Sequence, residues 1–396
     1  MNAFLNLIGR KSDLFKDDIK KNETQIQEKI VNSNFIVIGG AGSIGSAVVK
    51  EIFKRNPKKL HVIDINENNL TELVRDLRSE FGYIKGEFKT LALDVGSIEY
   101  DAFIRSDGKY DYILNLSALK HVRSEKDPFT LMRLINVNIL NTDKTLRHAI
   151  KNNAVKYFCV STDKATNPVN LMGASKRIME KYLIRRSSNI DVSTARFANV
   201  AFSDGSLLHS FDNRIKKRQP IAAPSDVKRY FLTPQESGEL CLLSCIFGKN
   251  REIYFPKLSK EKNLLSFSDL AIKYLKSKGY EAYICETEDE ARALVKTLPD
   301  NKKWPCLFTS SNTTGEKDIE EFFKKNEKLD MNKYINLGII KNNLENYNKE
   351  LDDFESAITK FKSNMIWDKE SIIEEFKKLI PEFNYIDKKK YLDGKM

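Results

Sequence analysis

The sequence predicts an α/β fold: a doubly wound parallel sheet, then a smaller substrate-binding region and a mostly helical C-terminal extension. Three observations favour this fold. Short apolar runs alternate with stretches of helical spacing up to about residue 200. Runs such as FIVIGG and YFCVS are almost continuously apolar, which is typical of parallel strands buried on both faces. A glycine-rich turn directly follows the first run and opens the first helical stretch.

Six strands and four helices are expected in the first half of the chain. In chain order, the strands are predicted at 34–40, 60–65, 88–95, 110–118, 156–163 and 192–200. The clearest helical stretches lie at 43–55, 68–81, 130–151 and 171–186. Successive parallel strands need crossover connections, and these crossovers are almost always right-handed. The alternation therefore predicts a Rossmann-type nucleotide-binding domain.

Beyond residue 200 the alternation is weaker. Short strands or loops are expected at 229–233 and 253–256, and helices at 268–278, 289–297, 314–325 and 366–380. Thr313 and Glu316 have the spacing of a capping box at the start of the third of these helices. Pro381 ends the last one, because proline cannot continue a helix.

The composition excludes several classes of protein. The chain has 396 residues, of which 41% are hydrophobic and 10% aromatic, and this indicates a folded globular protein. The longest apolar runs fall short of the roughly 20 residues that span a bilayer, so no membrane insertion is expected. The five scattered cysteines form neither a disulfide framework nor a CxxC pair, and the four histidines are far apart. We therefore expect no metal site and a reducing, cytoplasmic compartment.

The net charge is +11, from 66 basic and 55 acidic residues. Both signs are interspersed, and the densest basic stretches, at 216–218 and 388–390, are short. Nucleic acid is therefore not expected as a partner. A modest surplus of positive charge suits an anionic substrate of low molecular weight.

The turn Gly39-x-x-Gly42-x-x-Gly45 has the features of a dinucleotide-binding loop. Glycine allows the sharp turn, the close approach of a pyrophosphate and the tight packing of helix on strand. Ser43 and Ile44 stand at the helix N-terminus, where unpaired N–H groups attract phosphate. Further cofactor contacts are expected at the ends of the third and fourth strands, from Asp94, Val95, Leu116, Ser117 and Ala118.

Asp64 ends the second strand, 19 residues after Gly45. A carboxylate there accepts hydrogen bonds from both hydroxyls of an adenosine ribose and repels a 2′-phosphate. The next residues, Ile65 and Asn66, offer no arginine to bind such a phosphate. These features favour NAD over NADP as the cofactor.

Five motifs then carry a family resemblance. They are GGAGSIGS (39–46), SALKHVRSEKDP (117–128), STDKATNPVNLMGASKR (161–177), RFANVAFSDGS (196–206) and KRYFLTPQES (228–237). Together they resemble the extended short-chain dehydrogenase/reductases. Within that superfamily they are most similar to the bacterial UDP-N-acetylglucosamine 4,6-dehydratases of capsule, O-antigen and glycan-sugar synthesis. The resemblance covers residues 33–245.

The resemblance implies a reaction. Hydride passes from sugar C4 to NAD⁺, a base removes the C5 proton as the C6 hydroxyl leaves, and the hydride returns to C6. The product is a 4-keto-6-deoxy sugar nucleotide, and the resemblance also implies a UDP-sugar substrate and a homo-oligomer. The exact hexose, the nucleotide and the C5 configuration stay open.

The resemblance also implies residue roles. Thr162 would bind the C4 oxygen, Asp163 would handle protons at C6 and C4, and Lys164 would be the C5 base. A lysine acts as a base near neutral pH only if its pKa of about 10 is lowered. Lys176 would hold the nicotinamide ribose, and the expected substrate contacts are Lys120, His121, Asn199 and Arg229. Arg229 would bind the diphosphate, because a guanidinium can pair with two phosphate oxygens at once.

One position departs from the family pattern. Most of the superfamily has tyrosine four residues before the catalytic lysine, whereas this chain has Met172, whose thioether cannot exchange a proton. Some dehydratases of this family share the methionine, and Thr162, Asp163 and Lys164 remain here. Two alternatives stay open: a sugar-nucleotide 4-epimerase, which needs no C5 base, and a catalytically inactive NAD-binding sensor or scaffold.

These inferences suggest four regions. Residues 1–32 form an N-terminal helical lead-in, and residues 33–200 form the NAD-binding Rossmann domain. Residues 201–300 form a sugar-nucleotide-binding region, part of which returns to the Rossmann domain, and residues 301–396 form the helical C-terminal extension.

Overall fold

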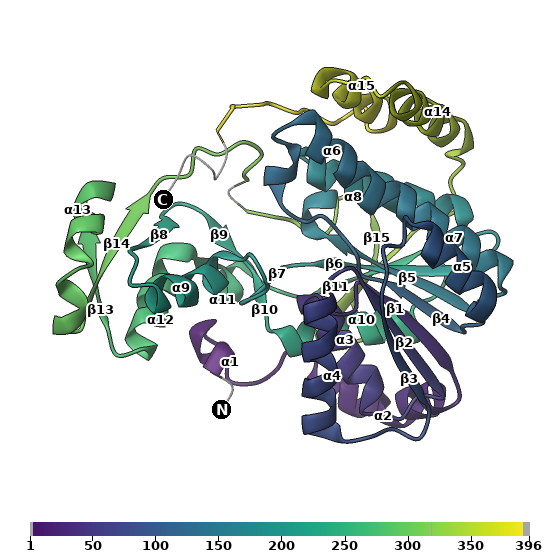
Figure 1. The fold of residues 1–396 in the computed structure, drawn as a ribbon, viewed down its shortest axis with the longest axis horizontal. Coiled ribbons are helices and arrows are strands. Elements are labelled where there is room, and N and C mark those ends of the chain that lie inside the picture. Colours follow the sequence, from purple (N-terminus) through teal and green to yellow (C-terminus); the bar gives the residue numbers. More distant parts are fainter. Residues whose placement is uncertain (1–2, 318, 391–396) are drawn as a thin grey trace.

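The computed structural model describes residues 3–317 and 319–390. The strands of its main sheet are β1 (Asn34–Ile38), β2 (Lys59–Asp64), β3 (Glu87–Ala92), β4 (Tyr112–Asn115), β5 (Lys156–Thr162), β6 (Asp191–Phe197), β11 (Glu252–Pro256), β15 (Lys328–Asp330) and β16 (Leu337–Lys341). Among the residues described, these nine strands pair in the order β15-β16-β11-β6-β5-β4-β1-β2-β3 (Figure 1). All six strands expected in the first half of the chain are confirmed.

The pairing from β3 to β11 is parallel throughout, and β16 and β15 extend the sheet in antiparallel fashion. The chain leaves β1 toward β2 on one side and later returns to place β4 on the other. The carboxyl ends of β1 and β4 therefore form a topological switch point, where ligands bind in sheets of this kind. The doubly wound α/β fold class is confirmed.

Helices cover both faces of the sheet (Figure 1). The helices on one face are α2 (Lys16–Val31), α3 (Ser43–Phe53), α4 (Glu67–Phe81) and α10 (Pro234–Phe247), and those on the other are α5 (Ile98–Asp107), α6 (Pro128–Ile135), α7 (Asn141–Lys151) and α8 (Leu171–Arg186). Strand residues alternate between the two cores: Val37 packs on the first face and Ile38 on the second.

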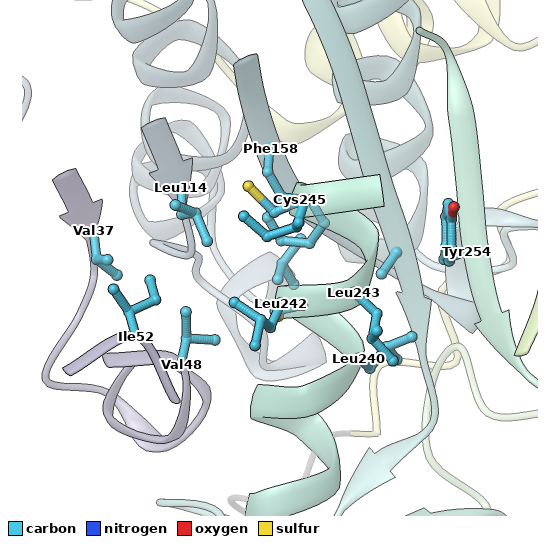
Figure 2. Close-up of a cluster of buried hydrophobic side chains, with 14 of the residues drawn as sticks. Val37, Val48, Ile52, Leu114, Phe158, Leu240, Leu242, Leu243, Cys245 and Tyr254 are labelled. Atoms are coloured by element: carbon cyan, nitrogen blue, oxygen red, sulfur yellow. The ribbon is translucent and has the colours of Figure 1, made fainter. Parts of the chain in front are cut away.

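Helix α10 fills the centre of the first face. Its residues Leu240, Leu242 and Cys245 are fully or almost fully buried, and they belong to the same hydrophobic cluster as Val37 of β1 (Figure 2). All five cysteines of the chain are free and buried, as expected of structural rather than redox-active thiols.

The expected helix at 130–151 is divided into three parts. A π-helical turn, η2 (Asn136–Leu140), lies between α6 and α7. From this turn the buried side chain of Asn138 binds both the N–H and the carbonyl group of Leu119, at 2.9 and 3.0 Å, and the hydroxyl of Ser175, at 3.0 Å. The turn therefore fixes the loop after β4 relative to helix α8.

A smaller lobe contains a parallel three-stranded sheet. Its strands are β8 (Ile221–Pro224), β13 (Glu281–Cys285) and β14 (Lys303–Thr309), and its helices are α1 (Ala3–Leu7), α9 (Leu207–Lys216), α11 (Lys260–Asn263), α12 (Phe267–Ser277) and α13 (Glu288–Leu294). The short strands β7 (Asn199–Val200), β9 (Lys228–Arg229), β10 (Phe231–Leu232) and β12 (Leu265–Ser266) form two further pairs, β7 with β10 and β9 with β12. The helices expected at 268–278 and 289–297 are confirmed as α12 and α13.

The C-terminal part holds helices α14 (Asn348–Asn364) and α15 (Lys369–Leu379), which pack on α6 and α8 (Figure 1). The helix expected at 366–380 is confirmed as α15. Residues 301–341 also contain the strands β14, β15 and β16.

The helix expected at 314–325 is wrong: the described part of this range consists of turns, bends and irregular chain. Gly315 is left-handed, with φ +71°, and breaks the helical path. Nearby carboxylates form tertiary pairs with residues of the sheet domain, which we describe below. No helix in the described parts of the chain is long and apolar enough to cross a membrane.

Candidate active site

The glycine turn after β1 depends on its glycines. Gly39 has φ +71°, and a Cβ there would lie 2.6 Å from the backbone nitrogen of Ser117. A Cβ at Gly45 would lie 2.0 Å from the carbonyl oxygen of Gly39. Gly42 is the N-cap of α3 and has no side chain with which to bind the first N–H groups of the helix. The turn therefore leaves these groups for an anionic ligand.

Two adjoining cavities meet at this turn. One has a volume of about 250 Å³ and lies over the ends of β1, β2 and β4; the other has a volume of about 410 Å³ and extends past the end of β5. Every expected cofactor residue lines at least one of them: Gly39, Gly42, Ser43, Ile44, Gly45, Asp64, Asp94, Val95, Leu116, Ser117, Ala118 and Lys176.

Two carboxylates that are fixed by hydrogen bonds line the smaller cavity. Asp64 accepts hydrogen bonds from the N–H groups of Ala41 and Asn66, both at 3.0 Å. Asp94 accepts from the N–H of Gly96 at 2.8 Å and from Arg133 at 3.1 Å. Although partial burial opposes it, these two contacts lower the pKa of Asp94. The carboxylates and the uncapped glycine turn fit an adenosine and its pyrophosphate.

The larger cavity brings together the expected catalytic residues at the end of β5. Thr162 and Lys164 line it, and Asp163 lies beneath this lining with 2% of its surface exposed. The Oδ1 atom of Asp163 accepts hydrogen bonds from Thr162 Oγ1 at 2.8 Å and from Lys164 Nζ at 3.2 Å. A 3₁₀ turn, η3 (Asp163–Ala165), ends the strand alternation here and lets neighbouring side chains share one site.

The electrostatics of Lys164 differ from expectation. Burial alone would lower its pKa, but the nearby carboxylates of Asp163 and Glu320 outweigh burial and raise it. Glu320 Oε1 lies 3.8 Å from Lys164 Nζ. Lys164 is therefore an ammonium at neutral pH, and the condition for a C5 base, a lowered pKa, is not met in this arrangement.

Helix α8 presents Met172 and Lys176 to the same cavity. Its N-terminus is held by Glu125, which accepts hydrogen bonds from the N–H groups of Leu171 and Met172 at 2.6 and 3.3 Å. Burial raises the pKa of Glu125 to about 7. Lys176 Nζ donates to the carbonyl oxygen of Val160 at 3.1 Å, and burial lowers its pKa.

Three of the four expected substrate residues line the larger cavity. Lys120 reaches Ser203 Oγ at 3.4 Å, and burial lowers the pKa of both Lys120 and His121. Asn199, on β7, lines the cavity beside them. The fourth, Arg229, lies outside the cavity lining and is 4% exposed. Its guanidinium donates to Glu316 Oε1 at 2.6 Å.

Several residues of this site were not foreseen from the sequence. Asp204 lines the larger cavity beside Ser43: its N–H donates to the hydroxyl oxygen of Ser43 at 2.8 Å, and that hydroxyl donates to Asp204 Oδ2 at 3.0 Å. Asp204 lies within a motif that we recognised, so its position carried a signal. Glu316 and Glu320 come from an irregular segment far along the chain. Glu316 was expected only as a helix-capping residue, from its spacing with Thr313, and no local pattern marks Glu320.

Comparison with known proteins adds to this picture. Residues 35–341 match the family model described as polysaccharide biosynthesis protein. The chain is 31% identical over 306 residues to an uncharacterized membrane protein of Methanocaldococcus jannaschii, covering 74% of this chain and 85% of that protein. It is 26% identical to the capsular polysaccharide biosynthesis protein CapD of Staphylococcus aureus, covering 85% of this chain but only 55% of CapD. It is 27% identical to the UDP-glucose 4-epimerase of Rickettsia massiliae, covering 74% of this chain and 83% of the epimerase.

Solved structures share the fold. Pen from Bacillus thuringiensis superposes with a TM-score of 0.65 at 23% identity, over 80% of this chain and 89% of Pen. The dTDP-glucose 4,6-dehydratase DesIV from Streptomyces venezuelae superposes with a TM-score of 0.55 at 17% identity, over 73% of this chain and 88% of DesIV. The extended short-chain dehydrogenase/reductase fold inferred from the motifs is confirmed. By its sequence, over the sheet domain and the smaller lobe together, the chain belongs to the family of polysaccharide biosynthesis proteins.

Proposed function

We propose that this protein is an NAD-dependent sugar-nucleotide 4,6-dehydratase that converts UDP-N-acetylglucosamine to a UDP-4-keto-6-deoxy-hexosamine. One observation carries the proposal: Thr162, Asp163 and Lys164 form a connected polar group in the cavity that continues from the glycine turn. The likeness to CapD and to the dehydratase DesIV supports it.

The cofactor would lie along both cavities. Asp64 would accept the ribose hydroxyls of the adenosine, the N-terminus of α3 would bind the pyrophosphate, and Lys176 would bind the second ribose. When bound, a nicotinamide dinucleotide supplies the oxidation at sugar C4 and the later reduction at C6.

Thr162 and Asp163 would remove the C4 hydroxyl proton in place of the missing tyrosine. The one hydroxyl proton of Thr162 is directed at Asp163 Oδ1, and its oxygen accepts a hydrogen bond from the N–H of Lys164 at 3.3 Å. One lone pair of this oxygen is left to accept a hydrogen bond from the substrate. A proton can then pass from the C4 hydroxyl to Thr162 as Thr162 passes its own to Asp163. Asp163 can later return that proton to the leaving C6 hydroxyl.

Lys164 would act at C5. As an ammonium, it stabilises the negative charge that develops when the C5 proton leaves next to a ketone. It can take up the C5 proton itself only after it has given up its own.

A 4-epimerase is the second candidate, favoured by the likeness to the rickettsial UDP-glucose 4-epimerase. It shares the oxidation at C4 but needs no proton transfer at C5 or C6. An inactive NAD-binding sensor or scaffold, the reading suggested by Met172, is the third.

Mass spectrometry of UDP-N-acetylglucosamine incubated with the purified protein and NAD separates the three. We expect a product that has lost one water. An isomer of equal mass would establish the epimerase instead, and unchanged substrate would support the sensor. Lys164→Ala and Asp163→Asn, each checked for NAD binding, should lose the dehydrated product; wild-type turnover in either would remove that residue from the mechanism.

A further inference from the structure

Glu320 enters the catalytic group from outside the sheet domain. It lies in segment 310–327, the chain between β14 and β15, which is irregular at the residues that the structure describes. Its side chain is 2% exposed, and its Oε1 atom is 3.8 Å from Lys164 Nζ. The Oε2 atom has no hydrogen-bond partner among the described residues, and the nearest cation to it is Lys317, at 3.9 Å. Burying a carboxylate oxygen without a hydrogen-bond partner costs free energy, so its presence in a folded protein needs an explanation.

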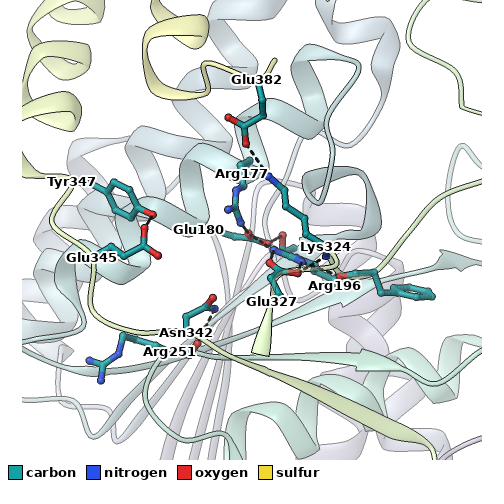
Figure 3. Close-up of polar contacts among 12 residues, drawn as sticks. Arg177, Glu180, Arg196, Arg251, Lys324, Glu327, Asn342, Glu345, Tyr347 and Glu382 are labelled. Carbon is teal, nitrogen blue, oxygen red and sulfur yellow. Dashed lines mark hydrogen bonds and ion pairs between the residues drawn. The ribbon is translucent and has the colours of Figure 1, made fainter. Parts of the chain in front are cut away.

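The segment is held in place at several points, so the position of Glu320 is not that of a free loop. The guanidinium of Arg196, on β6, donates to the carbonyl oxygen of Phe322 at 2.9 Å and to both carboxylate oxygens of Glu327 at 3.0 Å (Figure 3). Before Glu320 in the chain, the carbonyl oxygen of Gly315 accepts from Asn170 at 2.9 Å. Both anchors lie on the sheet domain, and they hold the segment so that Glu320 lies next to Lys164.

Resting on the proposed function, we propose that Glu320 is a positioning residue that exchanges a proton with Lys164 during turnover. In the resting pair, Lys164 carries –NH₃⁺ and Glu320 carries –COO⁻. An N–H bond of Lys164 breaks and an O–H bond forms on Oε1 of Glu320, which leaves –NH₂ and –COOH. The pair keeps the same total charge, and the neutral amine can then accept the C5 proton of the sugar.

The surroundings favour Glu320 over Asp163 as the proton acceptor. Asp163 Oδ1 is already occupied by two donors, Thr162 and Lys164. Burial, together with the charge of Asp163, raises the pKa of Glu320, while Lys164, Arg229 and Lys317 oppose that rise. The charged groups that act on Lys164 are Asp163, Glu320 and Arg229. The 3.8 Å separation exceeds a hydrogen bond, so transfer requires the flexible lysine side chain to approach Oε1.

Glu320→Gln tests the proposal, because it keeps the shape of the side chain and removes its charge and its capacity to accept a proton. Glu321→Gln is the matched control: its carboxylate is next in the chain, exposed, and bound only to Asn167 among the contacts shown. Glu320→Asp tests rescue by a shorter acid. Circular dichroism and NAD binding establish that each variant is folded.

The first readout needs no substrate. The rate at which acetic anhydride acetylates Lys164, followed by peptide mass spectrometry across pH, reports how much of the amine is neutral. We expect about tenfold faster labelling near neutral pH in Glu320→Gln, since loss of one nearby negative charge lowers the pKa of Lys164. Labelling identical to that of wild type would overturn the proposal.

The second readout follows exchange of the sugar C5 hydrogen in deuterium oxide. Even with a pKa lowered by this much, Lys164 of Glu320→Gln is still mostly protonated at neutral pH, and it has lost the carboxylate that takes up its proton during turnover. We therefore expect Glu320→Gln to exchange at least about tenfold more slowly while it still reduces the cofactor, with a changed pH profile that Glu320→Asp partly restores. Wild-type exchange in Glu320→Gln would overturn the proposal. If the wild-type protein formed no dehydrated sugar at all, the proposed function would fail, and the labelling experiment would still decide the relation between Glu320 and Lys164.

Discussion

Arg229 and Glu316 form an ion pair of 2.6 Å, although they are 87 residues apart. Arg229 lies on β9 with 4% of its side chain exposed, and Glu316 lies in segment 310–327. A carboxylate therefore binds the guanidinium that the sequence suggests for the substrate diphosphate. Glu320 of the same segment lies beside Lys164. Two carboxylates of one segment therefore pair with two basic residues that we assign to the proposed active site.

The first prediction concerns this pair. If Arg229 binds the diphosphate, it must give up Glu316, and Glu316→Gln should therefore tighten UDP binding. Glu316 is about one-third exposed, so the gain is limited to about 1 kcal/mol, or about fivefold in Kd. Isothermal titration calorimetry with UDP measures it, with Glu321→Gln as the control. Unchanged or weaker binding would show that Arg229 does not contact the diphosphate.

The second prediction concerns cofactor choice. Asp64 is held at the rim of the smaller cavity by the N–H groups of Ala41 and Asn66. Asp64→Ala should raise the Kd for NAD about tenfold or more, because hydrogen bonds to a charged group are lost, and should affect NADP less. Fluorescence titration with both dinucleotides measures this difference. Asp76→Asn, on the exposed surface of α4, serves as the control; an equal loss of affinity for both dinucleotides would contradict the assignment.

The third prediction concerns Met172, which is 4% exposed and lines the larger cavity. Because the proposed proton path runs through Thr162 and Asp163, Met172 has only to fill space. Met172→Leu, which conserves volume, should therefore keep the rate of keto-sugar formation within about threefold. A loss well beyond tenfold in a variant that still binds NAD would show that the thioether has a specific role. Met172→Tyr, which restores the common residue, should bring no increase in rate.

The fourth prediction concerns stability. Arg196 is fully buried between Glu180 and Glu327 (Figure 3). Arg196→Met would leave both carboxylates without their main partner, and should lower the free energy of unfolding by about 3–5 kcal/mol. Urea denaturation measures this loss. Arg75→Met, which removes an exposed pair with Glu72, should change stability by at most about 1 kcal/mol. A similar small change for Arg196→Met would contradict the role of the buried pair.

The same ion pair predicts how stability depends on pH. Burial alone would raise the pKa of Glu180, but Arg196 outweighs burial and lowers it from 4.5 to about 2. A depressed carboxylate pKa stabilises the folded state above the ordinary value, so this contribution should disappear as the pH falls from 4.5 toward 2. Urea denaturation at several pH values in this range measures the free energy of unfolding, which should fall less steeply with pH for Glu180→Gln than for the wild-type protein. An equally steep fall in both proteins would exclude Glu180 as the source of this pH dependence.

Much of the sheet domain and of the cofactor site could be predicted from residue patterns. Continuous apolar runs predict buried strands, and the stretches of helical spacing between them predict helices. Each prediction holds because the pattern of hydrophobic residues matches one local backbone geometry. The glycines of the turn and Asp64 are likewise local: their spacing within one strand–turn–helix–strand unit places them at the same sheet edge. For that reason, the residues expected around the cofactor all line the two cavities.

The tertiary structure alone decided the environment of Lys164. The charged state of Lys164 depends on Glu320, 156 positions further along the chain, and the partner of Arg229 comes from the same segment. Local spacing at 314–325 indicates a helix, but Gly315 and the long-range anchors on Arg196 and Asn170 outweigh that weak preference. The sequence by itself therefore determined which chemical groups the protein has and at which sheet edge most of them lie. Only folding determined which charges act on Lys164, because electrostatic interaction depends on distance in space and not on distance along the chain.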